Sequence, residues 1–247
     1  MKGGKLLAEG GYGCVFTPGI NCDGSVMKTK KYVSKIQRYD SSARNEIKIG
    51  KKIQELNGFE DHLSPILKYC EIDIASIEDK DKSKCSVFKK KKTKDFIVMK
   101  LQYIEGSDFM DYLINQKNSV QLVSNIIQSF NHILKSITML VSKDIVHYDI
   151  KGTNILFDIN KEIPLLIDFG LSVEINKINK TNLKDMFYVY APEYYIWSLE
   201  IHYICYLVNK NKEPTSEELK EICKKYVDGN KALQRNFSPN FKKKYLE

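Results

Sequence analysis

Three features are missing from this sequence, and each absence excludes a class of protein. The 247 residues contain no apolar run near the roughly 18 residues of a membrane-spanning helix. The N-terminus, Met1 to Gly4, leads into no apolar signal core, and position 2 is not the glycine that N-myristoylation needs. There are only 4 histidines and no Cys-x-x-Cys pair, which argues against a zinc site. We therefore expect a soluble, cytoplasmic protein that does not bind membranes.

The cysteines are scattered along the chain instead of forming close pairs. There are six of them, namely Cys14, Cys22, Cys70, Cys85, Cys205 and Cys223. Disulfide frameworks are rare in chains that carry no export signal. We therefore interpret all six cysteines as reduced thiols, in the core or at the surface.

The composition is that of a globular protein with surplus positive charge. Apolar residues make up 43% and charged residues 28%, and 39 Lys and Arg against 31 Asp and Glu give a net charge of +8. Such a surplus favours anionic partners: nucleotides, nucleic acid, acidic proteins or an anionic membrane surface. The runs Lys89–Lys92 and Lys242–Lys244 are either solvated segments or attractors of such partners. Because no nucleic-acid-reading motif accompanies them, nucleic acid is not expected.

The apolar pattern divides the chain into a β-rich first part and a helical second part. Strands are predicted at 5–7, 14–16, 32–36 and 96–103, with one helix from an N-cap at Ser41 or Ser42 to Leu56. The lysine-rich segment 80–94 is interpreted as a solvated loop between two strands. The boundary falls near Glu105, so we predict one domain with lobes over residues 1–104 and 105–247.

Helices and short strands are predicted in the second part. A stripe at steps of three and four residues predicts a core-facing helix over 119–142, formed by Leu122, Ile126, Phe130, Ile133, Ile137 and Leu140. Strands are expected at 145–146, 155–157 and 165–167, and another amphipathic helix at 216–226.

A glycine-rich turn lies between the first two predicted strands. It reads Ala8-Glu9-Gly10-Gly11-Tyr12-Gly13-Cys14-Val15. Glycines at such a turn let backbone amides approach phosphate oxygens, and the pattern G-x-G-x-x-G-x-V forms a flap over nucleotide phosphates. Gly10 and Gly13 fit the second and third glycines, whereas Ala8 stands at the first. A glycine-rich hairpin without a ligand is the alternative interpretation.

A lysine and a glutamate are predicted to pair nearby. Glu46 lies on the apolar face of the predicted helix, three and seven residues before Ile49 and Ile53. A carboxylate in that position needs a cationic partner to offset its desolvation. Lys35, on the predicted strand 11 residues earlier, is preferred to Lys28 as this partner and as a ligand of nucleotide phosphates.

Further polar residues follow the predicted 119–142 helix. The segment His147-Tyr148-Asp149-Ile150-Lys151-Gly152-Thr153-Asn154 precedes Asp168-Phe169-Gly170, and Ala191-Pro192-Glu193 comes later. Phosphoryl transfer needs a carboxylate to orient the attacking hydroxyl, oxygen ligands for Mg²⁺ and a cation near the γ-phosphate. Asp149, the pair Asn154 with Asp168, and Lys151 supply these groups in turn.

In order and spacing, these motifs resemble those of eukaryotic-type protein kinases from about Leu6 to Glu193. The resemblance implies a two-lobed α+β fold, with a small antiparallel β N-lobe that carries one helix and an abbreviated, mainly helical C-lobe. It implies ATP, Mg²⁺ and protein substrates, with Ser/Thr specificity favoured by Lys151. Residues 10–16 and 32–36 with Cys22 are also similar to the kinases of large nucleocytoplasmic DNA viruses, which would place the chain in the host cytoplasm or virion.

The resemblance also implies a nucleotide-binding hinge after the predicted strand 96–103. By that alignment Leu101 is the gatekeeper, and the backbone of Gln102, Tyr103 and Ile104 binds adenine. Asp108 would contact the ribose. The oligomeric state is not predicted.

The chain departs from the kinase pattern at further positions. Tyr148 replaces the Arg that receives an activation-loop phosphate, which implies activity independent of such phosphorylation. Met186 stands where Ser/Thr kinases carry Thr, and Tyr195 stands where an Asp braces the catalytic loop. A partner for Glu193 would be Arg235. These departures leave two alternatives to an active protein kinase: a pseudokinase acting as a nucleotide-binding or scaffold module, and a kinase of small molecules or nucleosides.

Overall fold

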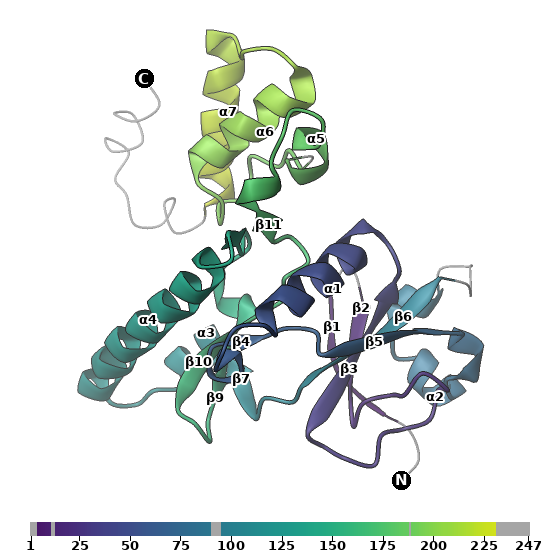
Figure 1. The fold of residues 1–247 in the computed structure, drawn as a ribbon. Helices are drawn as coiled ribbons and strands as arrows, with labels where there is room; N and C mark the ends of the chain where they lie inside the picture. The colour runs from purple at the N-terminus through teal and green to yellow at the C-terminus, as the bar shows by residue number, and fades with distance from the viewer. Residues whose placement is uncertain (1–3, 11–12, 90–94, 188, 231–247) are drawn as a thin grey trace. The chain divides into compact units, whose positions relative to one another are not determined.

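The computed structural model describes residues 4–10, 13–89, 95–187 and 189–230, and the chain forms two compact units (Figure 1). Unit 1 covers Met1–Val173 and unit 2 covers Glu174–Glu247. This partition differs from the predicted lobes over 1–104 and 105–247, which stay a prediction. Within the described residues, no helix is long and apolar enough to cross a membrane.

A five-stranded antiparallel sheet forms the first half of unit 1. Its strands, in spatial order, are β1 (Lys5–Glu9), β2 (Gly13–Thr17), β3 (Tyr32–Arg38), β6 (Phe96–Gln102) and β5 (Lys68–Ile72). Side chains alternate between its two faces, so Lys35 and its cross-strand partner Met99 share one face. The next pair, Ser34 and Lys100, points to the other face. We call these the inner and outer faces.

Helix α1 (Ser41–Ile53) covers the inner face of the sheet. Its N-cap is Asp40, whose Oδ1 accepts a hydrogen bond from the Ala43 N–H at 2.9 Å, so the predicted cap at Ser41 or Ser42 is wrong by one or two residues. Ala43 and Ile47 pack with Ile66, Ile97 and Met99. This packing fixes the helix against β6.

The outer face is covered by a segment that includes most of the predicted solvated loop. Residues 74–89 form three short helices, η2 (Ile74–Ser76), α2 (Asp79–Lys82) and η3 (Ser86–Lys89). Ile77 is buried on the sheet beside Phe96, and Phe88 packs against the same cluster. The loop interpretation is therefore wrong for the described part of the segment, because its few apolar side chains close a core despite the surrounding lysines.

Two disulfides cross this outer layer, and they correct the interpretation of all six cysteines as reduced thiols. Cys14 bonds Cys85, and Cys22 bonds Cys70. The partners are 71 and 48 residues apart in sequence, so only the folded sheet brings them together. Cys205 and Cys223 are free thiols, as predicted.

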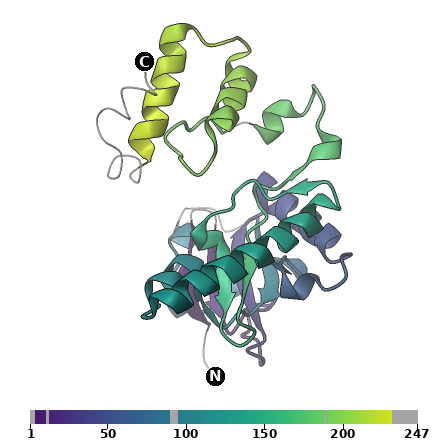
Figure 2. The ribbon, with the colours of Figure 1, turned by 90° about the vertical axis from the view of Figure 1, so that its left-hand side faces the viewer.

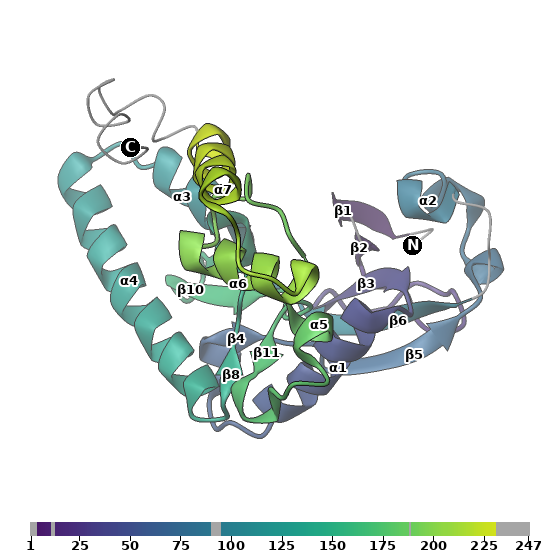
Figure 3. The same ribbon diagram turned by 90° about the horizontal axis from the view of Figure 1, so that it is seen from above.

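A second, four-stranded sheet and two helices complete unit 1. The strands, in spatial order, are β4 (Leu63–Ser64), β10 (Ile163–Ile167), β9 (Ile155–Asp158) and β7 (Gly106–Asp108). The helices are α3 (Phe109–Ile114) and α4 (Ser119–Val141), and the remaining short elements are η1 (Phe59–Asp61), β8 (Ile145–Val146) and η4 (Gly152–Asn154). Helix α4 and the five-stranded sheet lie at opposite ends of the unit (Figure 3).

The predicted stripe on α4, the long teal helix at the front of unit 1 in Figure 2, is only partly a core face. Leu140 is buried, and Ile133 and Ile137 pack against the same core, whereas Ile126 and Phe130 are exposed. The buried positions include Ser129 and Ser136 instead. The helix is therefore rotated from the prediction, because its buried face includes small hydroxyl residues that carry no hydrophobic signal.

Unit 2 is helical. After β11 (Val173–Glu174) at the division come η5 (Ile175–Lys177), α5 (Leu183–Met186), α6 (Leu199–Lys210) and α7 (Ser216–Gly229). A capping box between Thr215 and Glu218 begins α7 at the predicted residue. Trp197 and His202 are buried, and the His202 ring bonds the Tyr194 carbonyl at 3.0 Å. Unit 2 thus has a core of its own.

Candidate active site

Lys35 lies on the inner face of β3 between two carboxylates. Its Nζ donates to Glu46 Oε2 at 2.8 Å and to Asp168 Oδ1 at 3.2 Å. Glu46 is buried on α1 beside Ile49, while Asp168 follows β10. The ion pair between Lys35 and Glu46 that the helix periodicity predicts is therefore formed, and a second carboxylate joins it.

The pKa values of these three groups follow from burial and mutual attraction. Burial by itself lowers the pKa of Lys35, but the attraction of Glu46 and Asp168 raises it above its ordinary value. Burial raises the pKa of Glu46, and Lys35 offsets only part of that effect. Burial also acts to raise the pKa of Asp168, but the nearby Lys35 ammonium lowers it below the ordinary value. Lys35 and Asp168 thus stay charged at neutral pH.

A backbone turn places Asp168 where Lys35 reaches it. Asp168 has a φ of 63°, in the left-handed region that non-glycine residues rarely adopt. The following Gly170 lies so close to α1 that an added Cβ would come within 2.7 Å of Ser42 Oγ. Asn45 on α1 donates to the carbonyls of Gly170 and Ser172 at 3.0 and 2.8 Å. Helix α1 therefore fixes both Glu46 and the segment that carries Asp168.

Asp149, Lys151 and Asn154 form a second cluster between β8 and β9. Lys151 Nζ donates to Asp149 Oδ2 at 2.9 Å. The Asn154 amide donates to the same oxygen at 2.8 Å and to the Asp149 carbonyl at 2.9 Å. The Asp149 carboxylate is buried and held in one orientation by two donors from its own loop.

His147 joins this loop to the strand that leads to Asp168. Its buried ring donates from Nε2 to the Ile167 carbonyl at 3.0 Å, and Nδ1 accepts from the Asp149 N–H at 3.3 Å. Burial lowers the pKa of His147, which keeps the imidazole neutral and able to accept at Nδ1. Ser172 Oγ donates to the His147 carbonyl at 3.1 Å. The two carboxylate-bearing segments are thus held together through one neutral ring.

The glycine-rich turn lies next to Lys35 in the sheet. Val15 on β2 is the cross-strand partner of Lys35 on β3, and Ala8 pairs with Val15 from β1. The Gly10 N–H donates to the Gly13 carbonyl at 2.9 Å. A Cβ at Gly13 would meet the Ile36 carbonyl at 2.6 Å, so glycine is required there. Gly11 and Tyr12 lie outside the described residues.

The predicted hinge follows β6 directly. Leu101 and Gln102 end that strand opposite Val33 and Tyr32, and Leu101 packs against the cluster of Ile97 and Met99. The Tyr103 N–H donates to the Lys31 carbonyl at 2.9 Å, and Ile104 is buried. The role of these residues in adenine binding stays a prediction.

Asp108 is held by the start of helix α3. It is the N-cap of that helix, and its Oδ1 accepts from the N–H groups of Met110 and Asp111, both at 3.0 Å. The sequence pattern contains this signal, a single Asp before an apolar helix, although the predicted role is ribose contact. That role stays a prediction.

Unit 2 carries the other residues singled out from the sequence. The Glu193 backbone lies against Gly229 of α7, where no Cβ would fit. Met186 ends α5, and Tyr195 is exposed. Arg235, the predicted partner of Glu193, lies outside the described residues, as do Lys90–Lys92 and Lys242–Lys244.

The residues of this site that the sequence pattern did not reveal are Asn45 and Ser172. Neither of them belongs to any of the sequence motifs. Each acts through the backbone of another segment, so only the fold shows its role.

The sequence is similar to those of known proteins. Residues 1–243 match the family model described as protein kinase domain. A probable serine/threonine-protein kinase of Dictyostelium discoideum is 38% identical over 104 residues, which cover 38% of this chain and 15% of that protein.

Two other relatives match with similar coverage. The serine/threonine-protein kinase STE20 of Kluyveromyces lactis is 34% identical over 98 residues, 38% of this chain and 9% of that protein. The dual specificity protein kinase zakA of Dictyostelium discoideum is 34% identical over 83 residues, 34% of this chain and 10% of that protein. The matched regions are thus a small part of these longer relatives.

Proposed function

The chain belongs to the protein kinase domain family, and from that premise we propose that it transfers the γ-phosphate of Mg-ATP to serine or threonine hydroxyls of protein substrates. The observation that carries the proposal is the presence of two clusters in one unit, Lys35 with Glu46 and Asp168, and Asp149 with Lys151 and Asn154. A scaffold fold does not require five charged groups and an amide to be held in this way. Phosphoryl transfer requires each of them.

The residues present fit a divalent cation. Asp168 offers a carboxylate that stays ionised because its pKa is lowered. Asn154 uses its amide nitrogen to hold Asp149, which turns the nitrogen inward and leaves the amide oxygen as the ligand atom. Oxygen ligands of this kind suit Mg²⁺. Mg-ATP supplies the phosphoryl group and the positive charge that balances it during transfer.

Each of these site residues then has a defined task in the proposed reaction. Lys35, oriented by Glu46, binds nucleotide phosphates beneath the flap that carries Gly10 and Gly13. Asp149 orients the substrate hydroxyl and accepts its proton, since Lys151 and Asn154 hold its carboxylate in place. Lys151 also stabilises negative charge on the transferred group.

The substrate class rests on Lys151 and on the names of the relatives. Two of the relatives above are named serine/threonine kinases, and one is named dual specificity. Met186, in place of the expected Thr, is the feature that opposes Ser/Thr preference. Tyr148 in place of Arg leads us to propose that phosphorylation of the chain is not needed for activity. The cytoplasmic location and the resemblance to viral kinases stay predictions.

The test is transfer of the γ-phosphate from Mg-ATP to a generic protein mixture, beside the matched variant Asp149→Asn. We expect phosphoserine and phosphothreonine with the wild type, and a loss of at least roughly 100-fold in the variant. Phosphotyrosine would contradict the assigned specificity. Loss of activity after phosphatase treatment of the protein would contradict the proposed independence from phosphorylation.

The second candidate function is a pseudokinase, favoured by Tyr148, Met186 and Tyr195. It predicts that ATP raises the melting temperature of the protein while no phosphate is transferred. An equal ATP-induced rise in melting temperature in wild type and Lys35→Met would instead mean that the nucleotide does not bind beside Lys35.

A further inference from the structure

A pocket of about 480 Å³ opens on the outer face of the five-stranded sheet. Its walls come from the loop between β2 and β3, from β5 and from β6. Ile20 and Val98, both buried, belong to its lining, and Met27 adds a flexible apolar side chain. Because Lys35 points to the inner face, this pocket is separate from the candidate active site.

Three lysines also line the pocket, namely Lys28, Lys68 and Lys100, and none of its lining residues is acidic. Lys68 and Lys100 are direct cross-strand partners in the β5–β6 ladder. Like charges placed opposite each other destabilise a sheet. Among the described residues, neither lysine forms an ion pair.

The Lys100 ammonium is fixed by an aromatic ring. Its Nζ lies 3.6 Å from the centroid of the Tyr32 ring, a cation–π contact. This contact orients the charge without neutralising it. The site therefore keeps its positive charge in a defined place.

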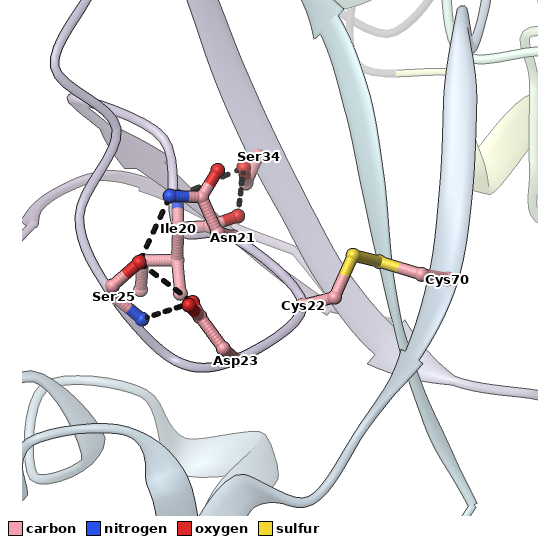
Figure 4. Close-up of a disulfide and its surroundings, with 7 residues drawn as sticks. All are labelled: Ile20, Asn21, Cys22, Asp23, Ser25, Ser34 and Cys70. Carbon is pink, nitrogen blue, oxygen red and sulfur yellow. Dashed lines mark hydrogen bonds between the residues drawn. A yellow bond between two sulfur atoms is a disulfide. The ribbon is translucent and has the colours of Figure 1, made fainter.

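The loop that closes the pocket is fastened at two positions near its start, Ile20 and Cys22 (Figure 4). Cys22 is bonded to Cys70 on β5, and Ser34 Oγ both accepts from the Ile20 N–H at 2.9 Å and donates to its carbonyl at 2.8 Å. The nearby acid, Asp23, is turned into its own loop. Its Oδ1 accepts from the Ser25 N–H at 2.9 Å and from Ser25 Oγ at 2.6 Å.

We propose that this pocket binds a small organic phosphate, with its phosphate between Lys68 and Lys100 and its apolar part against Ile20 and Val98. A phosphate relieves the repulsion between the two lysines, and Lys28 adds a third cation. A bare inorganic ion would bind less tightly, because it would bury none of the apolar lining of the pocket. Binding at this pocket does not depend on the proposed kinase activity.

The experiment titrates the protein with 1-naphthyl phosphate and follows binding by calorimetry. Lys68→Gln removes one of the paired charges. The control is Lys30→Gln, since Lys30 is an exposed lysine of the loop between β2 and β3 that does not line the pocket. We expect about tenfold weaker binding in Lys68→Gln and no more than about a twofold change in Lys30→Gln. Variants that bind equally would overturn the proposal.

Two further measurements distinguish this pocket from the nucleotide site and test its apolar lining. Binding should persist with saturating adenosine, which carries no phosphate, whereas competition would assign the probe to the nucleotide site and overturn the proposal. Inorganic phosphate should bind at least about tenfold more weakly than 1-naphthyl phosphate. Equal binding would show that the apolar lining contributes nothing and would overturn the ligand class.

Discussion

The two faces of the five-stranded sheet place lysines in opposite circumstances. On the inner face, Lys35 is surrounded by acids and held by Glu46 at 2.8 Å and Asp168 at 3.2 Å. On the outer face, Lys68 lies opposite another lysine, Lys100. One face thus holds a charge already balanced within the chain, and the other holds charges arranged for a partner. The same residue type therefore has different energetic consequences on the two faces of one sheet.

The largest change in the charge balance of the inner face is expected from Lys35→Met. It leaves Glu46 buried without a cation, so we expect loss of phosphoryl transfer by roughly 100-fold or more and a fall of about 3 kcal/mol in the free energy of unfolding. Urea unfolding at pH 7 measures the second effect. The control Lys28→Met, on the outer face, should change stability by less than about 0.5 kcal/mol.

A double variant separates the two consequences of that change. Lys35→Met with Glu46→Leu replaces the pair by apolar side chains and should regain most of the stability but none of the activity. A single Lys35→Met variant as stable as the wild type would show that Glu46 is not a buried charge.

The inner face could be predicted from the sequence because its signals are local or come in a fixed order. The 3.6-residue period of α1 puts Glu46 beside Ile49 and Ile53, so a cationic partner is required. That requirement favours Lys35 over Lys28, and the structure places Lys28 at the outer pocket. The hydrogen bonds from Asn45 and Ser172 to the backbone of other segments could not be predicted, since these two residues belong to no recognisable motif.

The outer face could not be predicted because it depends on contacts between distant segments. Cys14 and Cys85 carry no spacing signal, and the packing of Phe88 against the core is hidden within a lysine-rich stretch.

The rotation of α4, which leaves Phe130 exposed and Ser136 buried, also depends on contacts between distant segments. Periodicity predicts that a helix forms, whereas the neighbouring elements decide which face is covered.

The next largest effect is expected from the outer disulfides. Replacing Cys14 and Cys85 together by serine should lower the free energy of unfolding by about 3 kcal/mol, since the bond closes a long loop in the unfolded chain. Denaturant unfolding of the variant and of the wild type, each with and without dithiothreitol, measures it. The free thiols provide the control, because Cys223→Ser should leave stability within about 0.5 kcal/mol. A reductant that leaves wild-type stability unchanged would contradict the assigned bond.

A smaller effect concerns pH and His147. Burial lowers its pKa in the folded state, while the unfolded chain keeps the ordinary value of 6.5. Unfolding therefore takes up a proton below pH 6.5, and stability falls by about 1.4 kcal/mol per pH unit until the folded-state pKa is reached. In His147→Asn, unfolding should take up one proton fewer, so the free energy of unfolding should fall less steeply with pH. Unfolding curves between about pH 7.5 and 5 measure this difference. The control Ser172→Ala loses the bond to the His147 carbonyl but no titrating group, so its slope should stay unchanged.

The smallest effect, and the one that sharpens the comparison most, is that removal of an outer lysine should stabilise the protein. Lys68→Gln ends the repulsion with Lys100 across the β5–β6 ladder, so we expect the free energy of unfolding to rise by about 0.3 kcal/mol in low salt. The gain should disappear at about 1 M salt, where the Debye length is about 3 Å. Thermal unfolding at both salt concentrations, beside Lys30→Gln, measures it. A loss of stability on removing Lys68 would mean that an acid already balances the charge, and the outer face would then resemble the inner one.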